Sequence, residues 1–201
     1  MTVVHWARHG ENVANISRTF SYRVFDGELT DRGIAQAGQL AGALRAGGHR
    51  YGLLVCSPLR RATQTADIVS AGLGLPVAAE LEDLREVNVG DLDGRNDDRA
   101  WQVYAGTLAR WRAGDLGRRF PGGESGSELA ARIGRALGVI ARWAEPQDAI
   151  VVAHGASIRS ALPALTGQPD PGADLATGGL ARLVVTPGSG SAVDVALAVW
   201  T

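Results

Sequence analysis

An arginine and a histidine stand side by side directly after the first apolar run of the chain. Arg8 and His9 follow Val3–Ala7, and Gly10 comes next. The guanidinium of Arg8 would place a fixed positive charge beside an imidazole that can act as a nucleophile. Gly10 would let the backbone turn close to a bound molecule. These residue types suit an anion that is to be attacked, and phosphate is the obvious candidate.

Side chains that suit the same chemistry follow three further apolar runs. Arg61 comes shortly after the second run, Glu86 lies in a loop after a short third one, and His154 and Gly155 follow a fourth. Ligands of open parallel sheets bind outside the carboxyl ends of the strands. We therefore expect these side chains to meet the Arg-His pair at one edge of a sheet.

Phosphoryl transfer needs few groups, and these residue types supply them. The reaction requires an in-line nucleophile, neutralisation of the equatorial oxygens and a proton for the leaving oxygen. A neutral imidazole can attack without first losing a proton, which gives a phosphohistidine. Arginines and a second histidine can hold the oxygens by charge-assisted hydrogen bonds. A carboxylic acid can protonate the departing alkoxide and then activate water.

Segments typical of strands alternate with segments typical of helices. This alternation predicts an α/β fold, a single three-layer α/β/α domain over residues 1–201 with a mostly parallel, mixed sheet. The last two strands are expected to pair as a hairpin around a Gly-Ser turn. Strands are expected at 3–7, 53–56, 77–79, 149–153, 180–186 and 193–200, and helices at about 32–45, 59–73, 97–112, 125–143 and 157–165. Ser125 or Ser127 would cap the fourth helix.

A lid or insertion is expected at about 91–123. Six arginines at 95–119 stand there with Trp101, Tyr104 and Trp111. One interpretation is a lid that recognises an anionic or cyclic substrate; the other is a solvated amphipathic helix whose tryptophans pack on the domain, which the nearby aspartates favour. A second candidate lid segment, 19–28, holds three aromatic residues that could line a pocket mouth: Phe20, Tyr22 and Phe25.

The composition is that of an ordinary globular chain and narrows the possible partners. The formal net charge is −1, so no overall field draws the chain to nucleic acid or to a membrane surface. All 20 basic residues are arginine, which excludes a phosphate-loop or Schiff-base lysine. Cys56 is the only cysteine, so no intramolecular disulfide is expected. We expect a cytoplasmic protein, because neither a secretory signal nor a membrane-spanning apolar stretch is present.

The motifs, taken together and in order, resemble those of the histidine phosphatase superfamily, the phosphoglycerate-mutase-like proteins. The resemblance covers residues 3–165. The matching segments are Arg8-His9-Gly10-Glu11 with Asn15, Leu29-Thr30-Asp31-Arg32-Gly33, Ser57-Pro58-Leu59-Arg60-Arg61-Ala62, Leu84-Arg85-Glu86, Pro121-Gly122-Gly123-Glu124-Ser125 and His154-Gly155.

The resemblance implies a role for each residue of the site. His9 would be the phosphorylated nucleophile and Glu86 the proton donor. The substrate would be a phosphorylated small molecule, with no metal and no organic cofactor, and a homodimer is possible because family members are often dimers. The phosphoryl group would be bound by Arg8, Asn15, Arg61, His154 and Gly155.

Departures from the family pattern favour a phosphatase over a mutase. Mutases of the phosphoglycerate type carry Glu-Arg-His-Tyr-Gly where this chain has Glu86-Val87-Asn88-Val89-Gly90. The missing Arg and Tyr would grip the far end of phosphoglycerate. A metal-independent phosphatase is therefore the first hypothesis, and a mutase that needs a bisphosphate primer is the alternative. A non-catalytic phosphate-binding regulator is a third, against which the retention of every site residue argues.

The remaining two histidines are expected to be structural. His5 lies inside the first strand and is interpreted as a packed or hydrogen-bonded core residue, and His49 as a solvated side chain in a glycine-rich loop. The chain shows no Asp, His or Cys residues clustered at metal-ligand spacing.

Overall fold

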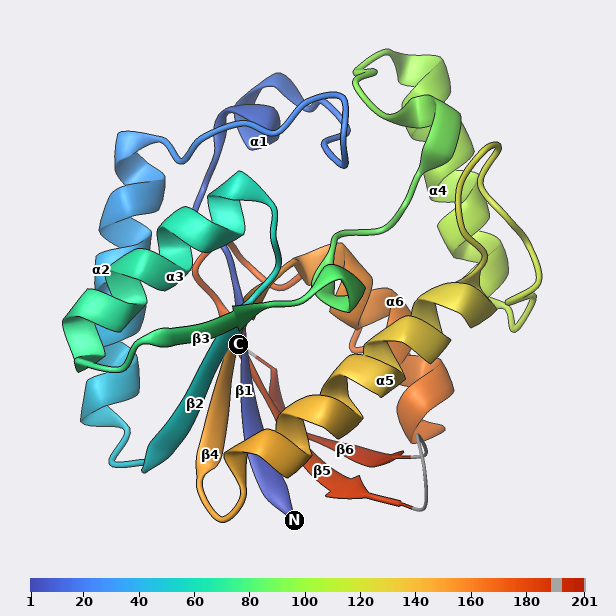
Figure 1. The fold of residues 1–201 in the computed structure, drawn as a ribbon. Helices are drawn as coiled ribbons and strands as arrows, with labels where there is room; N and C mark the ends of the chain where they lie inside the picture. The colour runs from blue at the N-terminus through green and yellow to red at the C-terminus, as the bar shows by residue number, and fades with distance from the viewer. Residues whose placement is uncertain (189–192, 201) are drawn as a thin grey trace.

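A mixed sheet forms the centre of the molecule in the computed structural model, which describes residues 1–188 and 193–200. The order of its strands is β3-β2-β4-β1-β5-β6 (Figure 1). The first four strands of the chain run parallel to one another, and β5 lies antiparallel to both β1 and β6. The bounds are β1 Thr2–Arg8, β2 Tyr51–Cys56, β3 Val77–Glu80, β4 Asp148–Ala153, β5 Leu180–Pro187 and β6 Val193–Trp200.

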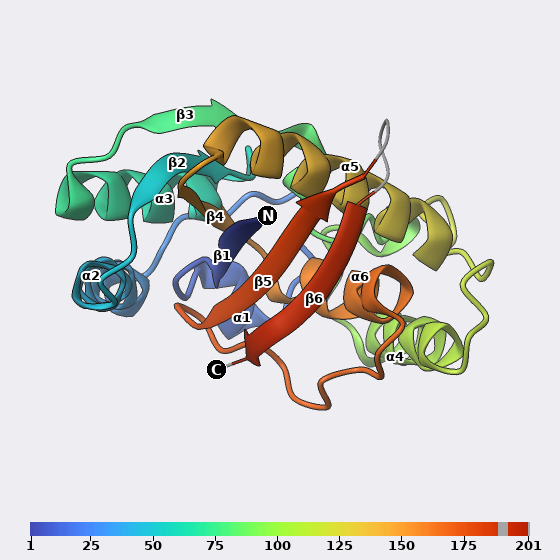
Figure 2. The same ribbon diagram turned by 90° about the horizontal axis from the view of Figure 1, so that it is seen from below.

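The predicted hairpin at the end of the chain is present. β5 and β6 pair from Ala181 with Trp200 to Pro187 with Val193, and the two strands lie side by side at one edge of the sheet (Figure 2). The expected Gly-Ser turn falls mostly on residues 189–192, which lie outside the described residues.

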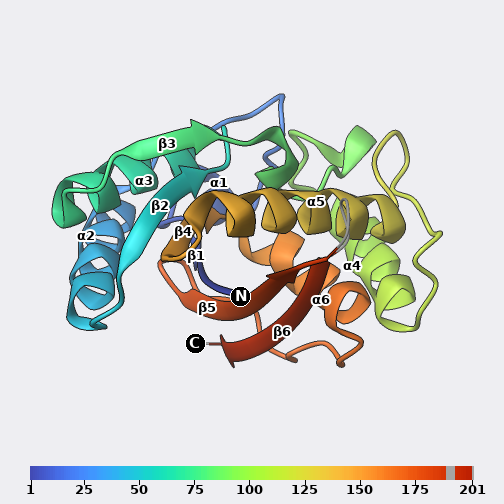
Figure 3. The ribbon, with the colours of Figure 1, turned by 60° about the horizontal axis from the view of Figure 1, so that its bottom comes forward.

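Helices pack on both faces of the sheet, which gives the three layers that the sequence predicts. In β4, Ile150 and Val152 pack with α2 and α3, whereas Ala149, Val151 and Ala153 pack with α5 on the other face. Figure 3 shows α5 lying across the strands, with α2 and α3 beside β2. The helices are α1 Val13–Ser17, α2 Asp31–Ala46, α3 Arg60–Leu73, α4 Asp98–Arg112, α5 Gly126–Ala144 and α6 Gly155–Thr166.

The helix starts follow from side chains that accept hydrogen bonds from the first turn. Thr30 caps α2, Asp97 caps α4 and Ser125 caps α5, where Glu128 completes a capping box.

Helix α1 was not expected. It has five residues, too few for a hydrophobic period, and the mutual caps of Asn12 and Asn15 hold it. None of the described helices has the length and apolar content needed to cross a bilayer.

Two glycines let the turn after β1 pass against the start of α2. A Cβ on Gly10 would lie 2.3 Å from the carbonyl oxygen of Gly33, and a Cβ on Gly33 would lie 2.0 Å from that of Glu11. Both distances are far shorter than van der Waals contact, and the clashing atoms belong to backbone. The start of α2 therefore fixes the position of the turn that carries His9.

Replacing Gly33 with alanine is expected to destabilise the fold by about 1–3 kcal/mol, because the methyl group forces two backbone segments apart. Urea unfolding measures the effect. Gly38→Ala in the same helix is the control, because a Cβ there meets nothing within 4 Å among the described residues. It should be neutral or stabilise by up to about 1 kcal/mol. Equal effects of the two substitutions would contradict the close approach.

Candidate active site

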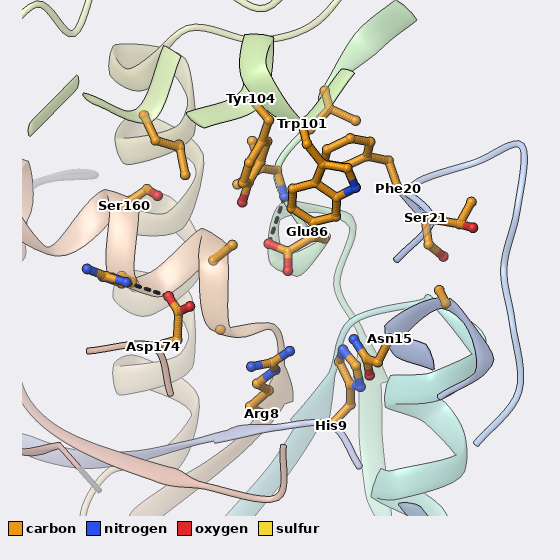
Figure 4. A pocket seen from close by; sticks show the side chains of 18 of the residues that line it. Arg8, His9, Asn15, Phe20, Ser21, Glu86, Trp101, Tyr104, Ser160 and Asp174 are labelled. Atoms are coloured by element: carbon orange, nitrogen blue, oxygen red, sulfur yellow. Dashed lines mark hydrogen bonds and ion pairs between the residues drawn. The ribbon is translucent and has the colours of Figure 1, made fainter. Parts of the chain in front are cut away.

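A cavity of about 410 Å³ opens at the carboxyl edge of the sheet. Arg8 and His9 reach it from the end of β1, Arg61 from the first turn of α3, and Gly155 from the start of α6. Figure 4 shows Arg8 and His9 on one side of this space and Glu86 on the other. The ends of three strands thus bring the predicted residue types to one place.

The imidazole of His9 is held in one tautomer. Its side chain is only 2% exposed, and Nδ1 lies 2.7 Å from the carbonyl oxygen of Gly10. A carbonyl only accepts hydrogen bonds, so Nδ1 carries the proton and the lone pair is on Nε2. That nitrogen accepts a hydrogen bond of 3.0 Å from Nε of Arg61. The nitrogen with nucleophilic character is therefore Nε2.

Burial lowers the pKa of His9 well below the usual 6.5, and the positive charges of Arg61 and Arg8 lower it further. Burial and the charge of Arg61 lower the pKa of His154 in the same direction. A lowered pKa favours the neutral form of an imidazole. Both rings consequently remain neutral at neutral pH, and His9 retains the lone pair that nucleophilic attack requires.

Two arginines supply positive charge beside His9. Arg61 is almost fully buried, and its Nη1 and Nη2 donate to the hydroxyl and carbonyl of Ser21 at 3.0 and 3.1 Å. Asp26 lies 3.6 Å from the same guanidinium. Arg8 donates to the carbonyl of Leu175 at 2.6 Å. Each guanidinium keeps further donors, so the pair can bind the oxygens of a phosphoryl dianion.

His154 lies behind the cavity rather than in its wall. It is fully buried, and its ring centroid is 5.2 Å from that of His9. Its Nε2 is 2.8 Å from the hydroxyl oxygen of Ser57, which also accepts a hydrogen bond from the Leu59 N–H. Its Nδ1 has no hydrogen-bond partner among the described residues. A phosphoryl oxygen bound between the two rings would provide one.

Glu86 is positioned through its backbone by an arginine of α5. Arg132 donates to the carbonyl oxygens of Glu86 and Arg85 at 2.9 and 2.8 Å and forms a buried ion pair of 2.8 Å with Glu124. The carboxylate of Glu86 accepts a 2.9 Å hydrogen bond from the Val87 N–H. Glu86 lies across the cavity from Arg8 and His9 (Figure 4). The second oxygen of its carboxylate can exchange a proton with a molecule bound between them.

Asn15 and Gly155 complete the floor of the cavity. Asn15, on α1, uses its carbonyl oxygen to accept from the Asn12 N–H at 3.1 Å, which leaves its amide donors for a ligand. A Cβ on Gly155 would lie 2.9 Å from Cδ of Arg8. The glycine therefore lets the Arg8 side chain lie against the start of α6, where backbone N–H groups favour anions.

Aromatic side chains form the wall of the cavity opposite its floor. The ring of Phe20 lies 4.5 Å from that of Trp101 and 5.0 Å from that of Tyr104, and all three line the cavity. The carboxylate of Asp93 accepts three hydrogen bonds of 2.7–2.8 Å, from the backbone N–H groups of residues 22, 23 and 24. This clamp ties the two candidate lid segments to each other.

A family model described as the histidine phosphatase superfamily (branch 1) matches residues 4–196. The 2,3-bisphosphoglycerate-dependent phosphoglycerate mutase of Methylobacterium sp. (strain 4-46) is 34% identical over 187 residues, which cover 86% of each chain. The chain belongs to the histidine phosphatase superfamily.

Solved structures of this superfamily share the fold over the whole chain. The mycobacterial glucosyl-3-phosphoglycerate phosphatase complexed with VO3 has a TM-score of 0.79 and 27% identity, with 100% of this chain and 98% of that chain covered. A structure described as mycobacterial hydrolase 1 has a TM-score of 0.81 and 26% identity over the same shares. These neighbours confirm the predicted phosphoglycerate-mutase-like α/β fold.

In this histidine phosphatase superfamily member, most residues singled out from sequence line one cavity. Of the residues to which the family resemblance gives a role in the site, only His154 does not line the cavity, because it is fully buried. Phe20 lines the cavity, whereas Tyr22 and Phe25 do not. Side chains that the sequence analysis did not single out also line it, and no motif marks them: Asn12, Ser21, Ser160 and Asp174. Arg112, one of the six arginines at 95–119, lines the cavity as well.

Replacing Arg61 with methionine is expected to raise the pKa of His9, because a positive charge that favours the neutral imidazole is removed. The pKa should stay below 6.5, since burial is the larger cause. Titration of the ring by NMR measures the shift. Arg60→Met is the matched control, because Arg60 is exposed and pairs with Glu28 outside the cavity. An unchanged His9 titration in the Arg61 variant would contradict the electrostatic account.

Proposed function

We propose that this protein is a metal-independent phosphatase that hydrolyses a small-molecule phosphomonoester through a phosphohistidine on His9. The observation that carries the proposal is the buried, neutral imidazole whose Nε2 lone pair lies against Arg61, beside Arg8 and across the cavity from Glu86. This one cavity brings a nucleophile, charge neutralisation and a proton donor together.

In the first step Nε2 of His9 attacks phosphorus in line with the ester oxygen. The P–N bond forms as the P–O bond to the leaving group breaks, and the departing oxygen takes a proton from Glu86. Arg61 must first exchange its hydrogen bond with Nε2 for one to a phosphoryl oxygen. Because Nδ1 donates to the Gly10 carbonyl, the positive charge that develops on the ring is stabilised as it forms.

The second step returns the enzyme to its starting state. The Glu86 carboxylate takes a proton from water, the water oxygen attacks phosphorus, and the P–N bond breaks to give orthophosphate and neutral His9. Arg8 and Arg61 carry two positive charges in total, which balance the phosphoryl dianion in both steps. His154 would donate from Nδ1 to a phosphoryl oxygen.

A phosphomutase is the second candidate, because the relative from Methylobacterium is named as a phosphoglycerate mutase. The cavity wall next to Glu86 argues for hydrolysis instead. Val87 and Val89 line it and offer no group to grip a carboxylate. A mutase must hold its product for a second transfer, whereas a phosphatase needs only to release the alcohol.

The far end of the cavity supports a substrate whose alcohol part is neutral. Arg159 and Arg112 both pair with Asp170 at 2.8 Å, and Arg159 also pairs with Asp174. These cations are already neutralised, so they offer little to a second anionic group. The aromatic wall would instead pack against a ring. We therefore propose a phosphate ester of a neutral cyclic alcohol as the substrate class.

Turnover of p-nitrophenyl phosphate in the presence of a chelator tests the proposed reaction. We expect hydrolysis that survives EDTA and releases one orthophosphate for each ester consumed. Strict dependence on a bisphosphate primer, with phosphate retained on the product of 3-phosphoglycerate, would establish the mutase instead. Loss of activity with EDTA would overturn metal-independent catalysis.

Replacing Asp174 with asparagine is expected to improve the use of 3-phosphoglycerate relative to a neutral sugar phosphate. The change frees part of the Arg159 charge for the substrate carboxylate. The gain in relative kcat/KM should be up to about fivefold, since an exposed ion pair contributes up to about 1 kcal/mol. Asp115→Asn, whose partner Arg110 lies outside this cavity, is the control. A gain in both variants, or in neither, would contradict the assigned role of Asp174.

A further inference from the structure

Three potential metal ligands meet at the end of the sheet opposite the cavity. His5 lies in β1, His49 in the segment that leads into β2, and Asp148 is the first residue of β4. The ligand atoms of the three side chains all lie within 4.8 Å of one another. In Figure 1 the segment before β2 and the start of β4 lie at the lower edge of the sheet, away from α1 and α4.

The geometry of the cluster fits a small divalent ion. Nδ1 of His49 lies 2.9 Å and Nε2 of His5 3.7 Å from the same carboxylate oxygen of Asp148. Ligand atoms about 2.0–2.1 Å from a tetrahedral zinc ion are about 3.3 Å apart, and the two distances bracket that value. Small movements of the side chains would bring three ligands to an ion and leave its fourth position to water.

His5 provides the second observation that points to a ligand. Its side chain is 1% exposed, and neither ring nitrogen has a hydrogen-bond partner among the described residues. The rings of His49 and Tyr51 pack edge-on against it at 4.4 and 5.0 Å. Buried polar groups in native proteins are normally satisfied, so an imidazole without a partner needs an explanation. An ion beside Asp148 would bind its Nε2.

His49 is not the freely solvated side chain that the sequence suggested. It is 28% exposed and hydrogen-bonded to Asp148. The partial exposure of His49 and of Asp148, which is 21% exposed, gives an ion a route to the cluster, whereas His5 forms its inner side. Two imidazoles and one carboxylate are ligands that zinc, nickel and cobalt ions accept, and calcium and magnesium prefer oxygen ligands.

We propose that His5, His49 and Asp148 form a binding site for a divalent transition metal ion. The ion would join β1, β4 and the segment before β2, and would act on stability rather than on the reaction, because the cluster lies at the opposite end of the sheet from His9. The inference does not rest on the proposed phosphatase activity.

One positive charge opposes the ion. Nη1 of Arg182, on β5, lies 3.5 Å from Nε2 of His49. When Nδ1 of His49 binds a metal, Nε2 must carry the ring proton and the guanidinium has to turn away. Removing the charge of Arg182 should therefore raise the affinity for the metal ion. If the three side chains only formed hydrogen bonds to one another, the same change would have no effect on metal affinity.

Titration of chelator-treated protein with Zn²⁺ by calorimetry tests the site. We expect one ion per chain and a higher midpoint of thermal unfolding. His49→Ala and Asp148→Asn should each weaken binding at least tenfold, and Arg182→Met should strengthen it. His9→Ala is the matched control, because it removes one of the four histidines of the chain from the other end of the sheet. It should leave Zn²⁺ affinity unchanged.

NMR of the wild-type protein gives a readout that needs no variant. The ring signals of His5 and His49 should shift with one equivalent of Zn²⁺, while those of His9 and His154 stay in place. Absence of binding, or equal affinity in the Asp148 variant, would overturn the site. Loss of binding in the His9 variant would place the ion in the cavity and would overturn it too. Chelator-resistant turnover tests the phosphatase separately.

Discussion

The His9→Ala variant should lose phosphatase activity, with kcat lower by about 10⁴-fold or more, as for other removed nucleophiles. The loss follows because His9 carries the only imidazole among the described residues that line the cavity, and its lone pair lies beside Arg61. Steady-state release of orthophosphate from p-nitrophenyl phosphate measures it. Calorimetry with inorganic phosphate should still detect binding, since Arg8 and Arg61 are retained.

His49→Ala is the control for the loss of a histidine, because His49 lies at the other end of the sheet. It should retain turnover. Near-wild-type turnover by the His9 variant would mean that water attacks the ester directly, and would contradict the covalent route. The phosphate titration and circular dichroism separate loss of the nucleophile from unfolding. A folded His9 variant that binds phosphate has lost only the nucleophile, whereas an unfolded variant should not bind phosphate.

The Glu86→Gln variant should lose activity according to the leaving group. For an alkyl phosphate, whose alkoxide needs a proton, kcat/KM should fall by about 10²–10⁴-fold, the usual contribution of general acid catalysis. For p-nitrophenyl phosphate, whose leaving group departs without a proton, kcat/KM should change little. This ratio reports the steps up to release of the alcohol, so slow hydrolysis of the phosphoenzyme does not obscure it.

Glu82→Gln is the matched control for Glu86, because Glu82 is an exposed carboxylate four residues away that pairs with Arg85. It should leave both kcat/KM values unchanged. An equal loss with both leaving groups in the Glu86 variant would assign that side chain to substrate binding rather than to proton transfer.

The sequence predicted the sheet, its hairpin and most of the cavity floor, because those features depend on local patterns. Apolar runs identify strands, and polar residues directly after a parallel strand lie at its carboxyl end. The pairing of Arg8 with His9 and the assignment of Arg61 to the site follow from this reasoning and from the family motifs. The sequence did not predict helix α1, because five residues are too few to show a hydrophobic period.

The features that the sequence did not predict depend on contacts between distant segments. The Asp93 clamp joins two loops, and Arg132 reaches from α5 to the backbone of Glu86. The cluster of His5, His49 and Asp148 was not predicted for the same reason, because its three residues come from separate segments at one end of the sheet. Spacing along the chain can reveal ligands on one helix or loop, but not ligands brought together by strand order.

The structure confirms the amphipathic-helix interpretation of residues 98–112, whose tryptophans pack on the domain, whereas substrate recognition by this segment stays a prediction. Trp111 is buried in the core and Arg110 pairs with Asp115 at the surface, as an amphipathic helix requires. Trp101 and Arg112, on the same helix, line the cavity. Whether the segment moves as a lid remains a prediction, and so do the homodimer and the cytoplasmic location.

Trapping the phosphoenzyme tests the central claim most directly. The wild-type protein, mixed with a labelled phosphomonoester and quenched in alkali within the first turnover, should carry up to one phosphoryl group per chain, located on His9 by mass spectrometry. Its decay should match the release of orthophosphate. Orthophosphate release with no label on the protein, or label on another residue, would contradict the phosphohistidine mechanism.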